Sequence, residues 1–184
     1  MAGLASSHTD RLRLEPWSRD AHGDEFAAMN AQPEVMRYLG GGGGMTRAES
    51  DATSATIAAH WETYGFGLWA AIERATGTML GFVGLCHPLW WPAMIERVEV
   101  GWRLRREAWG AGYATEGARE ALRAGFETLA LGEIVSFVDP GNERSLAVTR
   151  RLGMTVEADV PHPARADTTV RILSIASAAA RATG

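Results

Sequence analysis

Polar and apolar residues along the first third of the chain predict one strand followed by three helices. At residues 11–14 arginines alternate with leucines, which is typical of a short, half-buried strand. Pro33 fits the first turn of the second helix, and Thr46 and Glu49 have capping-box spacing at the start of the third. Five glycines at 40–44 predict a mobile loop between these two helices. The predicted helices cover residues 20–29, 33–39 and 47–63.

The middle of the chain is predicted to form antiparallel sheet. Two apolar segments flank a turn at 75–77, and a third apolar segment follows. In the third, alternate residues from Val98 to Leu104 share one face, whereas Glu99 and Gly101 share the other. The predicted strands cover residues 66–73, 78–86 and 95–104.

The last third of the chain is predicted to alternate between helices and strands. A helix after Gly112 carries an apolar stripe that can pack on the sheet, and a later helix led by Asn142 is expected to stop at a left-handed Gly153. A turn is expected at 161–163, and the alanine-rich end is expected to fray. The remaining predicted strands cover residues 133–138, 155–158 and 168–175.

Composition limits both the architecture and the class of function. The chain has 184 residues, 46% of them hydrophobic, which is enough for one sizeable core, so residues 1–184 are expected to form a single domain. A net charge of −4 argues against a nucleic-acid binder or a membrane-surface binder, because either would need a broad basic face.

The single cysteine, Cys86, excludes an intrachain disulfide, and without histidines at ligand spacing it makes a poor metal site. No metal is therefore expected, and a reducing compartment fits the free thiol. Residues 1–10 lack a cationic patch followed by an apolar run, and no apolar segment is long enough to cross a bilayer. A cytoplasmic protein is the expectation.

The most informative segment is a strand, a glycine-containing loop and a helix start over residues 98–116. Small residues at Gly110, Ala111 and Gly112 let backbone N–H groups approach a ligand closely, and the following helix directs its positive end to the same place. This order predicts an anion pocket suited to a pyrophosphate.

Two nucleotide motifs compete for this loop. It is not a Walker A loop, because no Gly-Lys-Ser/Thr follows, and Thr115 stands where a dinucleotide fingerprint has its third glycine. Glu133 does lie at a ribose-binding spacing, but the dinucleotide fold needs a parallel sheet, whereas the preceding segments predict an antiparallel one. A dinucleotide-dependent enzyme is therefore the second alternative.

Several ordered motifs resemble the GNAT acetyltransferases, and in particular the branch that is similar to ribosomal-protein N-acetyltransferases. The resemblance covers nearly the whole chain, and motifs in a fixed order are more specific than one loop. They are 9–14 (TDRLRL), 33–39 (PEVMRYL), 65–70 (GFGLWA), 98–102 (VEVGW), 109–116 (WGAGYATE), 142–145 (NERS) and 152–154 (LGM).

The resemblance implies an α/β GNAT fold, with a mixed, mostly antiparallel sheet between helices and strands that diverge after Leu104. It implies acetyl-coenzyme A as the donor, with its pyrophosphate held by backbone amides over residues 108–114. One departure is Glu107, where the family often has Gln or Arg, so Arg105 or Arg106 is expected either to compensate its charge or simply to be solvated. The residues expected at the cofactor are Trp102, Leu104, Arg105, Trp109, Gly110, Ala111, Gly112, Tyr113, Ala114, Thr115, Asn142 and Ser145.

For catalysis the expectation is direct attack of an amine on the thioester, whose carbonyl is polarised by a strand N–H, so Cys86 is dispensable. Glu99 is the first candidate for general base, and Glu157, which resembles a carboxylate used by this branch, is the rival; the alternative for Glu99 is a solvated side chain. By resemblance Asn142 contacts pantetheine and Ser145 protonates the thiolate, although both residue types also suit a helix start.

The acceptor is open: it is either the N-terminal amine of a protein or a small-molecule amine. The helices over residues 20–63 are expected to shape its site, and Trp90 and Trp91 either form a lip there or cover the sheet edge. A noncatalytic acyl-coenzyme A sensor is the alternative from another class, and a homodimer is a possible assembly.

Overall fold

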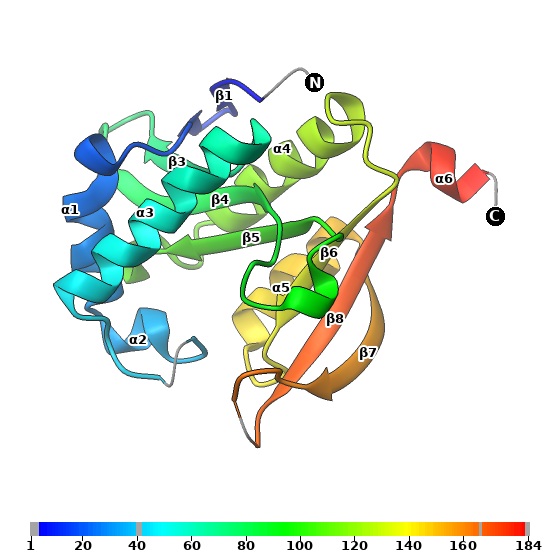
Figure 1. The fold of residues 1–184 in the computed structure, drawn as a ribbon. Helices are drawn as coiled ribbons and strands as arrows, with labels where there is room; N and C mark the ends of the chain where they lie inside the picture. Colours follow the sequence, from blue (N-terminus) through cyan, green and yellow to red (C-terminus); the bar gives the residue numbers. More distant parts are fainter. Residues whose placement is uncertain (1–3, 40–41, 166, 183–184) are drawn as a thin grey trace.

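A single eight-stranded sheet organises the protein. The computed structural model describes residues 4–39, 42–165 and 167–182, and its strands follow the order β1-β2-β3-β4-β5-β6-β8-β7 (Figure 1). Every neighbouring pair is antiparallel except β5 and β6. The strands are β1 (Ser7–His8), β2 (Leu12–Glu15), β3 (Leu68–Glu73), β4 (Met79–Cys86), β5 (Glu99–Leu104), β6 (Glu133–Val138), β7 (Thr155–Pro161) and β8 (Thr169–Ala176).

Helices cover both faces of this sheet, as the GNAT resemblance implies. On one face lie α1 (Arg19–Asn30), α2 (Pro33–Met36) and α3 (Arg47–Tyr64); on the other lie α4 (Tyr113–Glu127) and α5 (Glu143–Leu152) (Figure 1). Shorter elements are the 3₁₀ turns η1 (Pro92–Met94) and η2 (Arg106–Ala108) and the terminal helix α6 (Ala178–Ala182). No helix within the described ranges has the length and apolar character needed to cross a membrane.

Each face has its own apolar core. Phe26, Met36 and Phe82 belong to the cluster between the sheet and α1–α3, whereas Leu14 and Val100 belong to the cluster under α4 and α5. Helix α4 packs unusually close to the sheet, because a Cβ added at its Gly117 would lie 2.5 Å from Val83 Cγ1 of β4. Glycine therefore lets α4 lie directly on the sheet and fixes where its N-terminus lies.

The sheet opens between β5 and β6. These two strands share one register pair, Glu99 with Val135, and the Val135 N–H donates to the Val98 carbonyl at 2.9 Å. The separation thus begins after Glu99, and the expectation that the strands diverge after Leu104 was wrong. The reason is that β5 pairs with β4 along the whole length of β5, and β6 pairs with β8 along the whole length of β6. Strand β5 therefore follows β4, and β6 follows β8.

Some predicted boundaries were also wrong. The third middle strand begins at Glu99 and not at residue 95, because Pro92 starts a 3₁₀ turn. The second helix ends at Met36, β7 continues through Pro161, and a short helix that was not predicted, α6, covers Ala178–Ala182. Glycines 40–41 of the predicted mobile loop lie outside the described residues.

Candidate active site

A cleft opens where β5 and β6 separate. Its volume is about 1500 Å³, above the roughly 300–1,000 Å³ of an ordinary small-molecule site, which leaves room for two substrates. Two of the predicted site residues, Arg105 and Glu157, do not line it. Those that do are Glu99, Trp102, Leu104, Trp109, Gly110, Ala111, Gly112, Tyr113, Ala114, Thr115, Asn142 and Ser145.

The loop at one end of the cleft has the geometry of an anion cradle. Gly110 and Gly112 have φ angles of 78° and 88°, in the left-handed region that favours glycine, and Gly112 caps α4 without a side chain. No partner within the described part of the chain accepts from the N–H groups of Gly110, Ala111 or Gly112. Together with the free N–H groups of the first turn of α4, they can bind the oxygens of a pyrophosphate.

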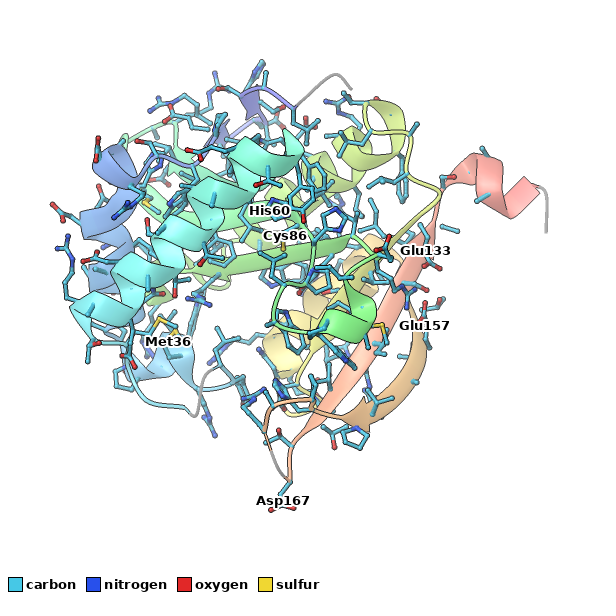
Figure 2. All side chains as sticks on the ribbon, viewed as in Figure 1. Met36, His60, Cys86, Glu133, Glu157 and Asp167 are labelled. Atoms are coloured by element: carbon cyan, nitrogen blue, oxygen red, sulfur yellow. The ribbon has the colours of Figure 1, made fainter. Side chains whose placement is uncertain are left out.

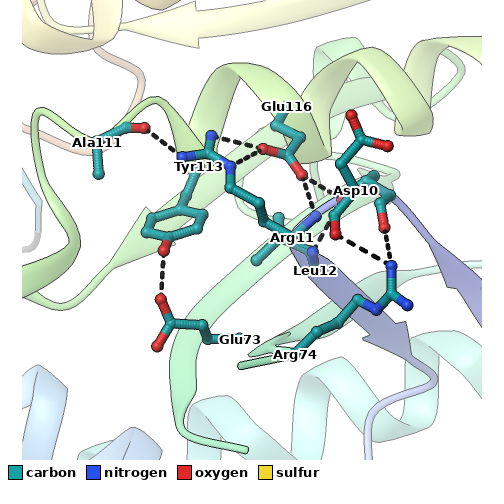
Figure 3. A network of polar contacts seen from close by, with 9 residues as sticks. Asp10, Arg11, Leu12, Glu73, Arg74, Ala111, Tyr113 and Glu116 are labelled. Carbon is teal, nitrogen blue, oxygen red and sulfur yellow. Dashed lines mark hydrogen bonds and ion pairs between the residues drawn. The ribbon is translucent and has the colours of Figure 1, made fainter. Parts of the chain in front are cut away.

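A network of side chains holds this loop against the β1–β2 turn (Figure 3). Arg11 Nη1 donates to the Ala111 carbonyl at 2.9 Å, its Nε donates to Glu116 at 2.7 Å, and its guanidinium lies 4.5 Å from the ring centroid of Tyr113. The Tyr113 hydroxyl donates to Glu73. Although burial opposes it, hydrogen bonds from Thr9 and Arg11 hold the pKa of Glu116 below its usual value, so this carboxylate does not leave an unpaired charge beside the cradle.

Arg105 does lie beside the Glu107 carboxylate, but this ion pair lies outside the cleft. Arg105 Nε lies 3.4 Å from the Glu107 carboxylate and its Nη1 donates to the Met79 carbonyl at 3.3 Å, so both side chains lie outside the cleft; Arg106 is exposed. Sequence reasoning missed the arginines that do line the cleft from the helices. They are Arg119, Arg123, Arg144 and Arg151, with Arg144 lying 4.6 Å from the ring centroid of Trp109.

Glu99 lies in the cleft where the two strands separate. Its side chain is partly enclosed, and desolvation raises its pKa to about 7 although the Trp90 indole N–H and the Phe137 backbone N–H favour the charged form. The alternative of a freely solvated Glu99 does not fit this position. A carboxylate with a pKa near 7 is suited to accept a proton at neutral pH.

Glu157, the rival base, lies elsewhere. Figure 2 shows it near Glu133, beside the strands β6 and β8. Arg97 binds both of its oxygens, at 2.8 and 2.7 Å, and also binds Glu133. The Arg97 guanidinium lowers the pKa of Glu157 to about 2, which leaves a weak base that is already paired.

Asn142 and Ser145 lie at the start of α5 and line the cleft. The Asn142 side chain accepts from the Ser145 N–H at 3.2 Å, which is the capping role that the sequence offered as an alternative. The Ser145 hydroxyl is half-buried and has no hydrogen-bond partner within the ranges that the structure describes. It is therefore available to a ligand.

Cys86 and the aromatic residues complete the wall around Glu99. Cys86 is paired in register with Glu99, and burial raises the pKa of its thiol well above the usual value, so it stays protonated. Trp91 packs on Phe137, whereas Trp90 is 42% exposed and stacks on His162 with ring centroids 5.2 Å apart. Of the two tryptophans, only Trp90 lines the cleft. Among the described residues, no group of three His, Cys, Asp or Glu side chains is arranged to hold a metal ion.

Comparison with known proteins agrees with this geometry. Residues 11–155 match the family model described as an acetyltransferase (GNAT) domain. The chain belongs to the GNAT acetyltransferase family. The mixed sheet, in which β5–β6 is the parallel pair, also leaves no support for the parallel dinucleotide fold.

Relatives of this GNAT protein include one with a named activity. This GNAT protein is 32% identical to the uncharacterized protein YkkB of Bacillus subtilis, over 79% of its own chain and 83% of YkkB. It is 31% identical to the FsC-acetyl coenzyme A-N(2)-transacetylase of Aspergillus fumigatus, over 80% of this chain and 64% of the relative. The crystal structure of an acetyltransferase from Agrobacterium tumefaciens superposes with a TM-score of 0.78 at 28% identity, covering 96% and 97% of the two chains.

Proposed function

We propose that this protein transfers the acetyl group of acetyl-coenzyme A to a primary amine by direct attack. The observation that carries the proposal is one cleft that holds an anion cradle at one end and a carboxylate of pKa about 7 further along. The cradle fits the pyrophosphate of coenzyme A, and the thioester supplies an activated acetyl group. The relative whose name includes acetyl coenzyme A and N(2) supports the same donor and a nitrogen acceptor.

In this proposal the residues of the cleft manage two protons. Glu99 takes a proton from the acceptor ammonium through a water, so that the nitrogen lone pair can form the new N–C bond. As the C–S bond breaks, the Ser145 hydroxyl gives a proton to the departing sulfur, and it regains through solvent the second proton that the nitrogen loses when the amide forms. The backbone N–H of Trp102 points to the edge of β5 that β6 leaves open, where it can polarise the thioester carbonyl.

The acceptor within this proposal is a primary amine, either the N-terminal α-amine of a protein or the amine of a small molecule. An α-amino group has a pKa of about 7.7–8.0 against about 10.4 for lysine, so an α-amine needs the least help from a base of pKa near 7, and an amine of higher pKa depends more strongly on that base. A cytoplasmic location is part of the same proposal and is supported by the free thiol of Cys86.

The decisive test is release of coenzyme A from acetyl-coenzyme A in the presence of a panel of α-amines and ε-amines. We expect amine-dependent release, with an acetylated amine as the product by mass spectrometry. A noncatalytic sensor would instead bind acetyl-coenzyme A in a calorimeter and release no coenzyme A with any amine, which would refute the proposal.

Replacing Ser145 by alanine should lower kcat by roughly 10- to 100-fold, because a general acid contributes at most a few orders of magnitude and solvent can replace it. KM for acetyl-coenzyme A should change by less than about threefold, since the cap is made by the Asn142 side chain and the backbone N–H of residue 145. Steady-state kinetics check this. An unchanged kcat would show that residue 145 serves only to start α5.

Replacing Cys86 by alanine should leave kcat within about twofold of the wild-type value, because direct attack needs no covalent intermediate and the thiol stays protonated. The progress curve should show no burst in either protein. Loss of activity in a variant that melts at the wild-type temperature would contradict direct attack.

A further inference from the structure

Arg103 is a half-buried cation that forms no ion pair within the described residues. It lies on β5 and lines the cleft, and desolvation lowers its pKa to about 10, so it remains charged at neutral pH. In the described part of the chain no carboxylate forms an ion pair with it, and its buried Nε has no hydrogen-bond partner. Buried polar atoms of a charged group are normally paired, so the Nε of Arg103 is available to a partner from outside the chain.

The known contacts of Arg103 hold it in place without neutralising it. Its Nη1 donates to the Asn30 side-chain oxygen at 2.8 Å, and the Asn30 amide donates in turn to Ser50 at 2.8 Å. The guanidinium lies 5.2 Å from the ring centroid of Phe82 and 5.9 Å from that of Phe26. These neighbours orient the group, but none carries a negative charge.

Arg103 also has the right relation to the proposed base. Glu99, Gly101 and Arg103 lie on the same face of β5, because side chains alternate along a strand. A Cβ at Gly101 would lie 3.8 Å from Leu68 Cδ2 and 3.9 Å from Glu99 Oε1, so Gly101 itself places no side chain between Glu99 and Arg103. Four strand residues place the Cα atoms of Glu99 and Arg103 roughly 13 Å apart.

A second orphaned arginine lines the same cleft. Within the described ranges, two buried side-chain nitrogen or oxygen atoms lack a partner, and both are arginine Nε atoms: those of Arg103 and Arg165. Arg165 belongs to the segment between β7 and β8, far from Arg103 in the sequence, and also lines the cleft. Two unpaired cations from different elements indicate a ligand that brings negative charge.

We propose that the acceptor is an amine that also carries a carboxylate, and that Arg103 binds this carboxylate while Glu99 faces the amine. The proposal rests on the acetyl transfer proposed above and names its substrate class. Because about 13 Å separates the two Cα atoms, the amine and the carboxylate are several bonds apart, as in an ω-amino acid or a short acidic peptide, and not adjacent as in a free α-amino acid.

The test uses matched pairs of acceptors: ω-amino acids of increasing length and the corresponding ω-amino amides. We expect the wild-type protein to prefer the acid by about 10- to 100-fold in kcat/KM, mainly through KM, since hydrogen bonds to charged groups are among the stronger ones. Arg103→Gln should abolish this preference, and Arg103→Lys should keep part of it. Equal use of acids and amides by the wild-type protein would overturn the subsite while leaving acetyl transfer standing.

Asn30→Ala provides the structural control. This variant loses the hydrogen bond between Arg103 and residue 30, as Arg103→Gln does, but it keeps the Arg103 cation. It should therefore lower the melting temperature and retain the preference for acids. If Arg103→Gln is folded and still prefers acids, the proposal is wrong. If no amine releases coenzyme A, the transferase assignment fails, and the subsite is then judged by whether acids raise the melting temperature of the wild-type protein more than amides do.

Discussion

Glu99→Gln should lower kcat/KM for acetyl transfer by about 10²- to 10⁴-fold, the usual contribution of a general base. The amide keeps the size and the polar contacts of the carboxylate but cannot accept a proton. Desolvation sets the pKa of Glu99 to about 7, so the ionised, active form is lost as the pH falls below 7. The wild-type rate should therefore rise with pH through about 7, and this limb should be missing in the variant, whose remaining pH dependence comes from the amine itself. Steady-state kinetics in steps of about half a pH unit, from about pH 5.5 to about pH 9, measure this pH dependence.

The matched control for this experiment is Glu157→Gln. Arg97 already holds Glu157 ionised outside the cleft. Loss of the Glu157 carboxylate should therefore change kcat/KM by less than about threefold, and the rate should still rise with pH through about 7. The opposite pattern, with the limb lost in Glu157→Gln and kept in Glu99→Gln, would assign the base to β7 and contradict the proposed geometry.

The sequence predicted the parts of the site that depend on local chemistry. The loop before α4 needs left-handed glycines and a helix start, and both requirements are visible in residues 109–116. The end of α5 at Gly153 and the face shared by Glu99 and Gly101 follow in the same way from turn chemistry and strand alternation. Each of these features involves residues within a few positions of one another.

Features that depend on distant pairs could not be predicted. Glu116 pairs with Arg11, 105 positions away, and Glu157 with Arg97, 60 positions away, and each pair decides whether a carboxylate is free. The raised pKa of Glu99 requires the enclosure that β6 and the segment before β5 provide. The orphaned state of Arg103 is visible only when every neighbour is known.

The opening of the sheet between β5 and β6 could be predicted from the sequence only in part. The resemblance to the family implies that two strands diverge, but the point of divergence depends on how far β6 follows β8, which pairs with it from Glu133 to Val138. Because the one shared register pair is Glu99 with Val135, the proposed base lies where the two strands begin to separate, which is where both substrates are proposed to meet. Had the strands separated at Leu104, Glu99 would have been enclosed between them.

Gly110→Leu should weaken acetyl-coenzyme A binding by roughly 30- to 1,000-fold, which corresponds to the loss of one or two charge-assisted hydrogen bonds, about 2–4 kcal/mol. A Cβ at Gly110 meets nothing within 4 Å, so the leucine would occupy the space where the phosphate is expected, and the φ of 78° disfavours a side chain. Calorimetric titration with acetyl-coenzyme A measures the effect.

Gly77→Leu separates backbone strain from the loss of the anion cradle. Gly77 lies in the β3–β4 turn with a φ of 75° and nothing within 4 Å of an added Cβ, so it suffers the same conformational penalty outside the cleft. Both variants should lose similar unfolding free energy, about 1–2 kcal/mol, yet only Gly110→Leu should lose affinity. Equal affinity in the two variants would mean that the turn entering α4 does not hold the diphosphate, and the proposed position of the donor, together with the roles of Glu99 and Ser145 that depend on it, would fall.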